Sequence, residues 1–233
     1  MKKFRLASVL MLAVAVVFVA GCTKPDDSND GGTLNGHTYV NLGLSSGTLW
    51  ATCNVGAETS NDYGDYFSWG ETATKDTYTT ANYKWYEGDQ RLTKYCYDSH
   101  LGYQGYTDNL TVLLPEDDAA TANWGSGWYT PTADQWIELY EYTTHIWKKQ
   151  DGVYGRLFTA TNGNTIFLPA AGAYSNDGFW GVGDNGLYWS SSLDTASPRS
   201  AWYFHFVLGN NYQMRNGFDR TNGFCVRPVC SSR

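Results

Sequence analysis

The stretch Pro131-Thr-Ala-Asp-Gln-Trp-Ile-Glu-Leu-Tyr-Glu-Tyr-Thr143 decides the fold class, because it holds the best helix signal in a chain of short strand-like segments. Thr132 and Gln135 have the spacing of a capping box, and a proline stands just before them. The apolar and partly apolar residues then recur on one helical face: Trp136, Leu139, Tyr140 and Thr143. We predict the main helix over about 132–146.

Glu138 and Glu141 fall on the opposite side of this helix. Two carboxylates so close could act as an acid and base pair, but an exposed helix face is the simpler interpretation. We expect both to be solvated. A second, short helix is predicted over about 115–122, where a proline and acidic residues suit a first turn.

Strand signals flank these helices on both sides. Apolar and aromatic runs bounded by glycine or Asn-Gly turns predict strands at 37–42, 48–52, 63–69, 155–160, 165–168, 188–191, 201–207 and 223–229. Residues 70–110 show little periodicity and are expected to form long loops. Strands followed by helices and then by more strands indicate an α+β fold rather than alternating βαβ units. No composition break follows Leu34, so we expect one domain over 34–233.

The composition excludes several classes of protein. The chain of 233 residues is 16% aromatic, which excludes a disordered protein. Neither glycine nor heptad periodicity is present, so collagen-like and coiled-coil structures are excluded too. The net charge of −7 comes without a visible basic patch, so no nucleic-acid partner is expected.

The N-terminus predicts a membrane anchor. Three cations within residues 1–5 precede an apolar run that ends in Val19-Ala20-Gly21-Cys22 and is short for a membrane span. This ending resembles the lipobox of bacterial lipoproteins, in which the cysteine is diacylated and becomes the first residue. We expect a signal peptide over 1–21, lipidation at Cys22 and a polar tether over 22–33. The charged start of the tether is similar to signals that send lipoproteins to the outer membrane, facing the exterior.

Four cysteines remain for the domain: Cys53, Cys96, Cys225 and Cys230. The expected compartment allows disulfides, and four cysteines allow three pairings, while buried free thiols are equally compatible with the sequence.

Catalytic and metal-binding patterns are missing from the sequence. It has no phosphate loop, no Gly-x-Ser-x-Gly and no zinc-like spacing of histidine and cysteine. No cofactor is expected. Structural calcium held by loop oxygens stays open, with no residues assigned to it.

Aromatic and amide residues are dense in the C-terminal third, as is typical of surfaces that recognise sugars or proteins. For Trp50, Trp69, Trp136 and Trp189 we favour burial in the core. The exposure of Tyr203, His205 and Tyr212 is left open, since turn residues lie beside them.

Ordered motifs along residues 34–230 resemble the Fibrobacter succinogenes major paralogous domain family. They are Val40-Asn-Leu-Gly-Leu-Ser45, Trp50-Ala-Thr-Cys-Asn-Val-Gly-Ala57, Tyr63-Gly-Asp-Tyr-Phe-Ser-Trp-Gly-Glu71, Leu114-Pro-Glu-Asp-Asp-Ala-Ala120, Asn123-Trp-Gly-Ser-Gly-Trp128, Gly163-Asn-Thr-Ile-Phe-Leu-Pro-Ala-Ala-Gly172, Tyr188-Trp-Ser-Ser-Ser192 and Val226-Arg-Pro-Val229. The resemblance implies a C-type-lectin-like fold and a secreted or lipid-anchored surface protein without general enzymatic activity. Family members often carry a cysteine where this chain has Thr143-Thr-His145, which puts a disulfide from there in doubt.

The same fold implies an alternative function. Formylglycine-generating enzymes carry a copper-binding cysteine pair at a spacing similar to that of Cys225 and Cys230, although their pair precedes the final strand motif. If this chain were such an enzyme, Cys225→Ser or Cys230→Ser would abolish a metal-dependent activity. A structural envelope component is a third alternative.

The C-terminus also resembles the variable region of proteins diversified by retroelements, in which adenine positions of a template are randomised. The candidate display residues are Tyr203, His205, Asn210, Asn211, Tyr212, Asn216, Phe218 and Asp219. Residues 203–224 contain no Lys or Glu, as randomised Asn codons would require, but Gln213 and Met214 would have to be fixed positions. A fixed-sequence loop region is the competing interpretation. We expect a non-enzymatic surface protein that binds a glycan or a protein on another surface through this C-terminal face.

Overall fold

The computed structural model of the protein describes residues 31–209 and 212–231, and at 212–216 only the backbone. The signal peptide over 1–21, Cys22 and most of the tether lie outside the described residues, as do Asn210 and Asn211. The first strand spans Gly31–Leu34, so it begins inside the range assigned to the tether.

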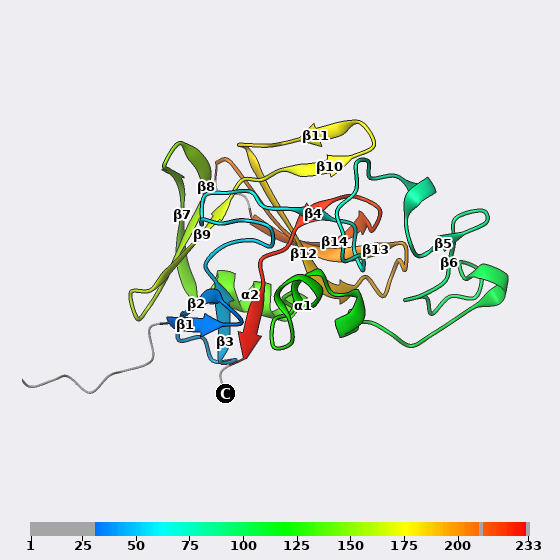
Figure 1. Cartoon of the computed structure of the whole chain (residues 1–233), viewed down its shortest axis with the longest axis horizontal. Coiled ribbons are helices and arrows are strands. Elements are labelled where there is room, and N and C mark those ends of the chain that lie inside the picture. The colour runs from blue at the N-terminus through cyan, green and yellow to red at the C-terminus, as the bar shows by residue number, and fades with distance from the viewer. Residues whose placement is uncertain (1–30, 210–211, 232–233) are drawn as a thin grey trace, which may run out of the picture.

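Three sheets build most of the domain (Figure 1). The first has the order β1-β2-β3-β16, formed by Gly31–Leu34, His37–Asn41, Thr48–Ala51 and Val229–Ser231. The central sheet has the order β14-β13-β12-β15-β4, formed by Tyr212–Asp219, Ser200–Val207, Asn185–Leu193, Phe224–Cys225 and Tyr66–Phe67. The third has the order β7-β8-β9, formed by Thr143–Gln150, Val153–Ala160 and Thr165–Pro169.

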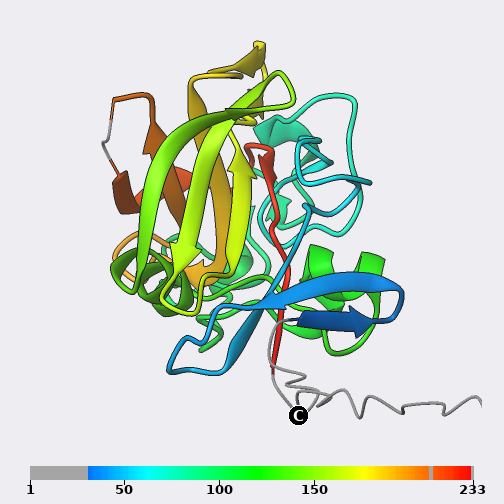
Figure 2. The ribbon, with the colours of Figure 1, turned by 90° about the vertical axis from the view of Figure 1, so that its left-hand side faces the viewer.

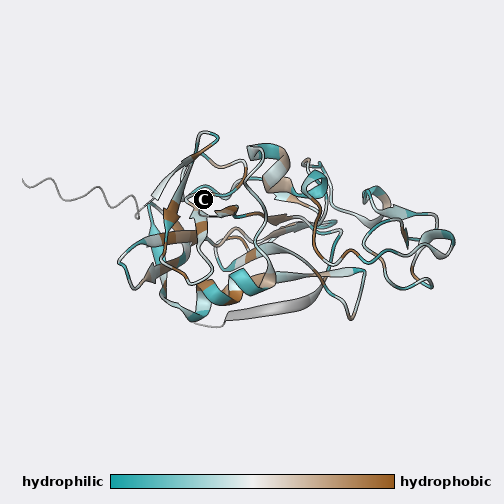
Figure 3. Cartoon of the chain, turned by 90° about the horizontal axis from the view of Figure 1, so that it is seen from below, coloured by the Kyte–Doolittle hydropathy of each residue, from teal (hydrophilic) through white to brown (hydrophobic). Residues whose placement is uncertain are grey.

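Two small hairpins complete the described strands. β10 and β11 span Ala173–Ser175 and Gly178–Trp180, and β5 and β6 span Tyr86–Glu87 and Arg91–Leu92. The second hairpin lies in the long loops predicted for 70–110, with short 3-10 turns at Thr80–Asn82 and Tyr103–Gly105. These loops form one end of the molecule and are mostly teal or pale in Figure 3, as their polar composition predicts.

The main helix is shorter than predicted. α2 spans Ala133–Glu141, with Thr132 as the N-cap and the predicted capping box to Gln135 in place. Residues 143–146, expected to be helical, belong to β7 instead and pair with β8 in the register Thr143↔Ala160. β-Branched residues lose side-chain freedom in a helix and pack well in a sheet, and here the neighbouring strand β8 decides the competition.

The short helix is divided. A 3-10 turn spans Pro115–Asp117 and α1 spans Ala119–Trp124. Between them Asp118 adopts an extended backbone, and its carboxylate accepts hydrogen bonds from the N–H groups of Ala120 and Thr121. An N-cap cannot itself be helical, so the single helix predicted over 115–122 was wrong.

Two predicted strands are also reduced. Of 63–69 only Tyr66–Phe67 pairs, and 223–229 splits into β15 and β16. Pro228 lacks an N–H for a ladder, so the chain leaves the central sheet after Cys225 and joins the first sheet at Val229.

The core lies on both faces of the central sheet. Successive side chains of a strand point to opposite faces. Leu187 and Trp189 of β12 accordingly pack in one buried cluster with Trp69 and Trp128, whereas Tyr188 packs in the other with Trp50 and Trp136. Trp50, Trp69, Trp136 and Trp189 are each at most 1% exposed, which confirms their prediction as core.

The structure thus confirms the coarse fold class, a mostly β fold with two α-helices among the residues that it describes. No helix among residues 31–209 and 212–231 is long and apolar enough to cross a membrane.

Candidate functional site

The structure separates the predicted display residues into scaffold and surface. Tyr203 is only 5% exposed and packs edge-on against Phe218, with ring centroids 5.2 Å apart. Its side chain is therefore part of the core and not a display position. Phe218 and Asp219 are half-buried in β14. The Asp219 carboxylate accepts a hydrogen bond from the backbone N–H of Thr221, so it shapes the turn that follows β14.

The structure describes the other predicted display residues in different detail. His205 is half-buried on β13, and its Nε2 lies 3.1 Å from Oδ1 of Asn185 on β12. Tyr212 and Asn216 lie on β14, an edge strand of the central sheet, but their side chains are outside the described residues. Asn210 and Asn211 fall outside them altogether.

An aromatic surface adjoins these residues. Trp180, at the end of β11, is 37% exposed and stacks on Phe218 with ring centroids 6.1 Å apart and an angle of 22° between the rings. The backbone N–H of Asn185 donates to the carbonyl of Gly181 at 2.8 Å, which fixes the chain directly after Trp180. We call Trp180, Phe218, His205 and Asn185 together the Trp180 face.

A polar groove lies at the other end of the same β10–β11 hairpin. It offers about 340 Å³ and is lined by hydroxyl, amide and carboxylate side chains together with one phenol: Tyr78, Thr79, Thr80, Ser175, Asn176, Asp177, Thr221 and Asn222. None of these lining residues is a lysine or an arginine. Burial raises the pKa of Tyr78 to about 12, so its hydroxyl stays protonated and donates to the carbonyl of Tyr66.

The hairpin between the two parts is held by stacked rings. Tyr174 stacks on Phe179 with centroids 4.3 Å apart, and the hydroxyl of Tyr174 donates to the carbonyl of Asp76. Figure 1 shows the hairpin raised above the central sheet. Phe179 itself is 60% exposed, so apolar ring surface reaches solvent along the hairpin. The Trp180 face and the groove therefore adjoin the same hairpin.

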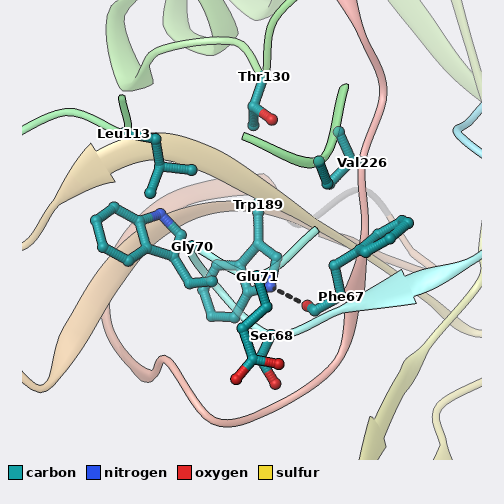
Figure 4. Close-up of a pocket in the computed structure, with 10 residues that line it drawn as sticks. Phe67, Ser68, Gly70, Glu71, Leu113, Thr130, Trp189 and Val226 are labelled. Atoms are coloured by element: carbon teal, nitrogen blue, oxygen red, sulfur yellow. Dashed lines mark hydrogen bonds between the residues drawn. The ribbon is translucent and has the colours of Figure 1, made fainter. Parts of the chain in front are cut away.

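A smaller cavity lies inside the core (Figure 4). Its lining includes Phe67, Glu71, Leu113 and Trp189, and its space of about 10 Å³ is no more than one water molecule needs. The indole of Trp189 donates to the carbonyl of Phe67 at 2.7 Å beside it. This cavity is a packing feature and not a ligand site.

The cysteines do not form a reactive pair in this geometry. Cys53, Cys96, Cys225 and Cys230 are all free thiols. Cys225 and Cys230 lie on different strands and in different core clusters. Burial raises the pKa of Cys230 to about 11 and that of Cys225 further still, which suppresses the thiolate needed for nucleophilic or metal chemistry.

Glu138 also differs from its prediction. It is half-buried, and its carboxylate accepts hydrogen bonds from the backbone N–H of Ser46 and the hydroxyl of Ser45, each at 2.8 Å. It thus ties α2 to the turn before β3. Within residues 31–209 and 212–231 no group of three or more histidine, cysteine, aspartate or glutamate side chains is placed to hold a metal ion.

Sequence reasoning missed most of the groove. The run Ser175-Asn-Asp-Gly178 has the composition of a turn, and that signal was available. The sequence could not show that this turn lies beside Tyr78 and Asn222. About a hundred residues separate Tyr78 from the turn.

Comparison with known protein families, with curated proteins and with solved structures finds no match to this chain.

Proposed function

We propose that this protein is a lipid-anchored bacterial surface protein that binds a ligand through the Trp180 face and the adjoining groove, without catalysing a reaction. The observation that carries the proposal is the stack of the exposed Trp180 on Phe218. Exposed aromatic rings fixed by a scaffold supply contact area at low entropic cost.

The chemistry of the groove favours a glycan over a protein as the ligand. Sugar hydroxyls pair with amide, hydroxyl and carboxylate groups, and the groove supplies all three. Its space of about 340 Å³ is at the lower end of the range for small-molecule sites. A saccharide in the groove would extend along the hairpin toward the rings of Phe179 and Trp180.

The test is a binding screen of the purified full-length protein against a glycan array and, separately, against surface proteins. Trp180→Ala should weaken binding by about 30-fold, the usual effect of truncating a central aromatic contact. Tyr142→Ala is the matched control, since Tyr142 is an aromatic residue 63% exposed that follows α2, outside the Trp180 face. Equal losses in both variants would refute the Trp180 face as the binding surface.

The anchor is tested separately. Cys22→Ser should move the protein from the outer-membrane fraction to the soluble fraction and abolish labelling with a fatty acid. Protease digestion of intact cells tests whether the domain faces the exterior. Retained fatty-acid labelling in Cys22→Ser would contradict the lipoprotein assignment.

We propose further that the domain has a C-type-lectin-like fold, belongs to the Fibrobacter succinogenes major paralogous domain family and is diversified at its C-terminus. Deep sequencing of the 3′ end of the gene with its flanking DNA tests the last of these. Changes should occur at Asn210, Asn211, Tyr212 and Asn216, beside a near-copy of the region and a reverse-transcriptase gene. Tyr203 should stay constant because it is core. An invariant 3′ end would leave a binder of fixed specificity.

A further inference from the structure

Arg156 is a buried cation in the middle of the three-stranded sheet. Its side chain is 0% exposed, and none of its three guanidinium nitrogens has a hydrogen-bond partner among the described residues. An unpaired buried charge is costly, and proteins normally satisfy it with a carboxylate, a ring of carbonyls or a bound ion.

A second unpaired donor lies directly across the strand pair. Trp147 of β7 is the register partner of Arg156 on β8, so the two side chains share one face of the sheet. The indole Nε1 of Trp147 is buried and also lacks a hydrogen-bond partner in the described part of the chain. Figure 2 looks onto the outer face of the β7-β8-β9 sheet. Trp147 and Arg156 lie on the other face, which is turned toward the central sheet, and both pack there against Phe206.

A second cation, Lys149, lies near this pair on the same face of the sheet. Lys149 and Tyr154 form the next register pair on the same face, and the Lys149 ammonium lies 4.8 Å from the ring centroid of Tyr154. His145 lies two residues from Trp147 in the other direction and stacks on Tyr140 of α2. Burial lowers the pKa of Arg156, and the phenol of Tyr140 is the acidic group that opposes this.

By contrast, Arg227 shows how this fold satisfies a buried guanidinium. It is also 0% exposed, but its nitrogens donate to Asn54 Oδ1 and to the carbonyls of Ala51 and Phe167 at 2.8–3.0 Å. Arg156 has no such acceptors among the described residues. Its three nitrogens therefore remain available to an acceptor that the described residues do not supply.

We propose that Arg156 and Trp147 Nε1 form a binding site for a small tetrahedral oxyanion, a phosphate or a sulfate, with Lys149 at its rim. The guanidinium offers a planar fork of donors that fits two oxygens of such an anion, and the indole N–H supplies a third hydrogen bond. Lys149 and Tyr154 lie on the same face of the sheet but are exposed to solvent. Their side chains must move apart for the anion to enter. The site lies on the opposite side of the central sheet from the Trp180 face and does not depend on the proposed function.

The test follows the indole N–H signals of the protein by NMR during titration with inorganic phosphate, and separately with sulfate, at constant ionic strength. The chain has 10 tryptophans, and Trp147→Phe identifies the signal of Trp147 by its loss. In the wild-type protein that signal should shift and saturate. Arg156→Met should weaken binding by about tenfold or more, because it removes the charged donors.

Matched variants of two adjacent lysines complete the design. Lys149→Ala should weaken binding several-fold, whereas Lys148→Ala, on the opposite face of β7, should not change it. Arg156→Met should also fold at least as stably as wild type in chloride buffer, since methionine removes an unpaired buried charge. The proposal is overturned if neither anion shifts the Trp147 signal, or if the shift persists unchanged in Arg156→Met.

Discussion

The guanidinium of Arg227 donates from Nη2 to the backbone carbonyl of Phe167 at 3.0 Å, and so joins the segment between β15 and β16 to β9. The same side chain donates to Ala51, the last residue of β3. One buried arginine thus connects strands of the first and third sheets at the point where the chain leaves the central sheet.

Arg227→Met should destabilise the protein strongly, by about 3–5 kcal/mol in urea unfolding. The substitution leaves two backbone carbonyls and the Asn54 amide oxygen without their donors in a dry interior. Arg199→Met is the control, because half-buried Arg199 makes one long hydrogen bond to the carbonyl of Gln90 at 3.2 Å. A loss in Arg227→Met no larger than in Arg199→Met would contradict this role.

Trp136→Ala should cost about 3–5 kcal/mol of unfolding free energy. Trp136 is 0% exposed and stacks on Phe204 with ring centroids 4.6 Å apart, so it is the contact by which α2 packs on the central sheet. The exposed Tyr142→Ala should change stability by less than about 0.5 kcal/mol. Comparable losses from the two variants, measured by urea unfolding, would show that α2 does not depend on this stack.

Glu138 should make the stability of the protein depend on acidity. Burial alone would raise the pKa of its carboxyl, but hydrogen bonds from Ser46 and Ser45 outweigh burial and hold the pKa below its ordinary value. A carboxyl with a lowered folded pKa stabilises the protein above its unfolded pKa and loses that contribution as pH falls through the folded pKa. Glu138→Gln should therefore lower stability near neutral pH and flatten the decline between about pH 5 and pH 3. Urea unfolding across this range measures it, and parallel curves for variant and wild type would argue against the effect.

The thiols should react in an order set by burial. Cys53 is half-buried, whereas Cys96, Cys225 and Cys230 are buried, and burial raises the pKa of each. With a thiol-specific disulfide reagent near pH 8, the native protein should react slowly and mainly at Cys53, and Cys53→Ser should be nearly silent. Denaturant should expose all four thiols of the domain. Rapid reaction of Cys225 or Cys230 in the native protein would reopen a catalytic role for that pair.

Local patterns in the sequence predicted several strands and the start of the main helix, but not the strands β7, β10, β11 and β14. The capping box of Thr132 with Gln135 fixed the start of α2, and the turn residues around residues 163 and 209 bounded the strands. The end of α2 was not predictable in this way, because Thr143 suits either a helical face or a strand. Pairing with Ala160 on β8 resolved that ambiguity.

The candidate site was only partly predictable for the same reason. The sequence predicted an aromatic and amide surface in the C-terminal third, and Phe218 and His205 do lie on the Trp180 face. It could not tell Tyr203 from His205, because both lie on one face of β13 and their burial depends on which distant residues cover that face at each position. Tyr203 packs under Phe218 and Phe224, whereas Trp180 comes from a different hairpin altogether.

The sequence by itself determined the α+β class, the helix start and the tryptophans of the core, because capping, periodicity and apolar content act over a few residues. Tertiary structure alone decided the rest. It split 223–229 between two sheets, brought Tyr78 and Asn222 to one groove, and set Trp147 and Arg156 side by side. Those relationships depend on contacts between distant segments, which no local pattern contains.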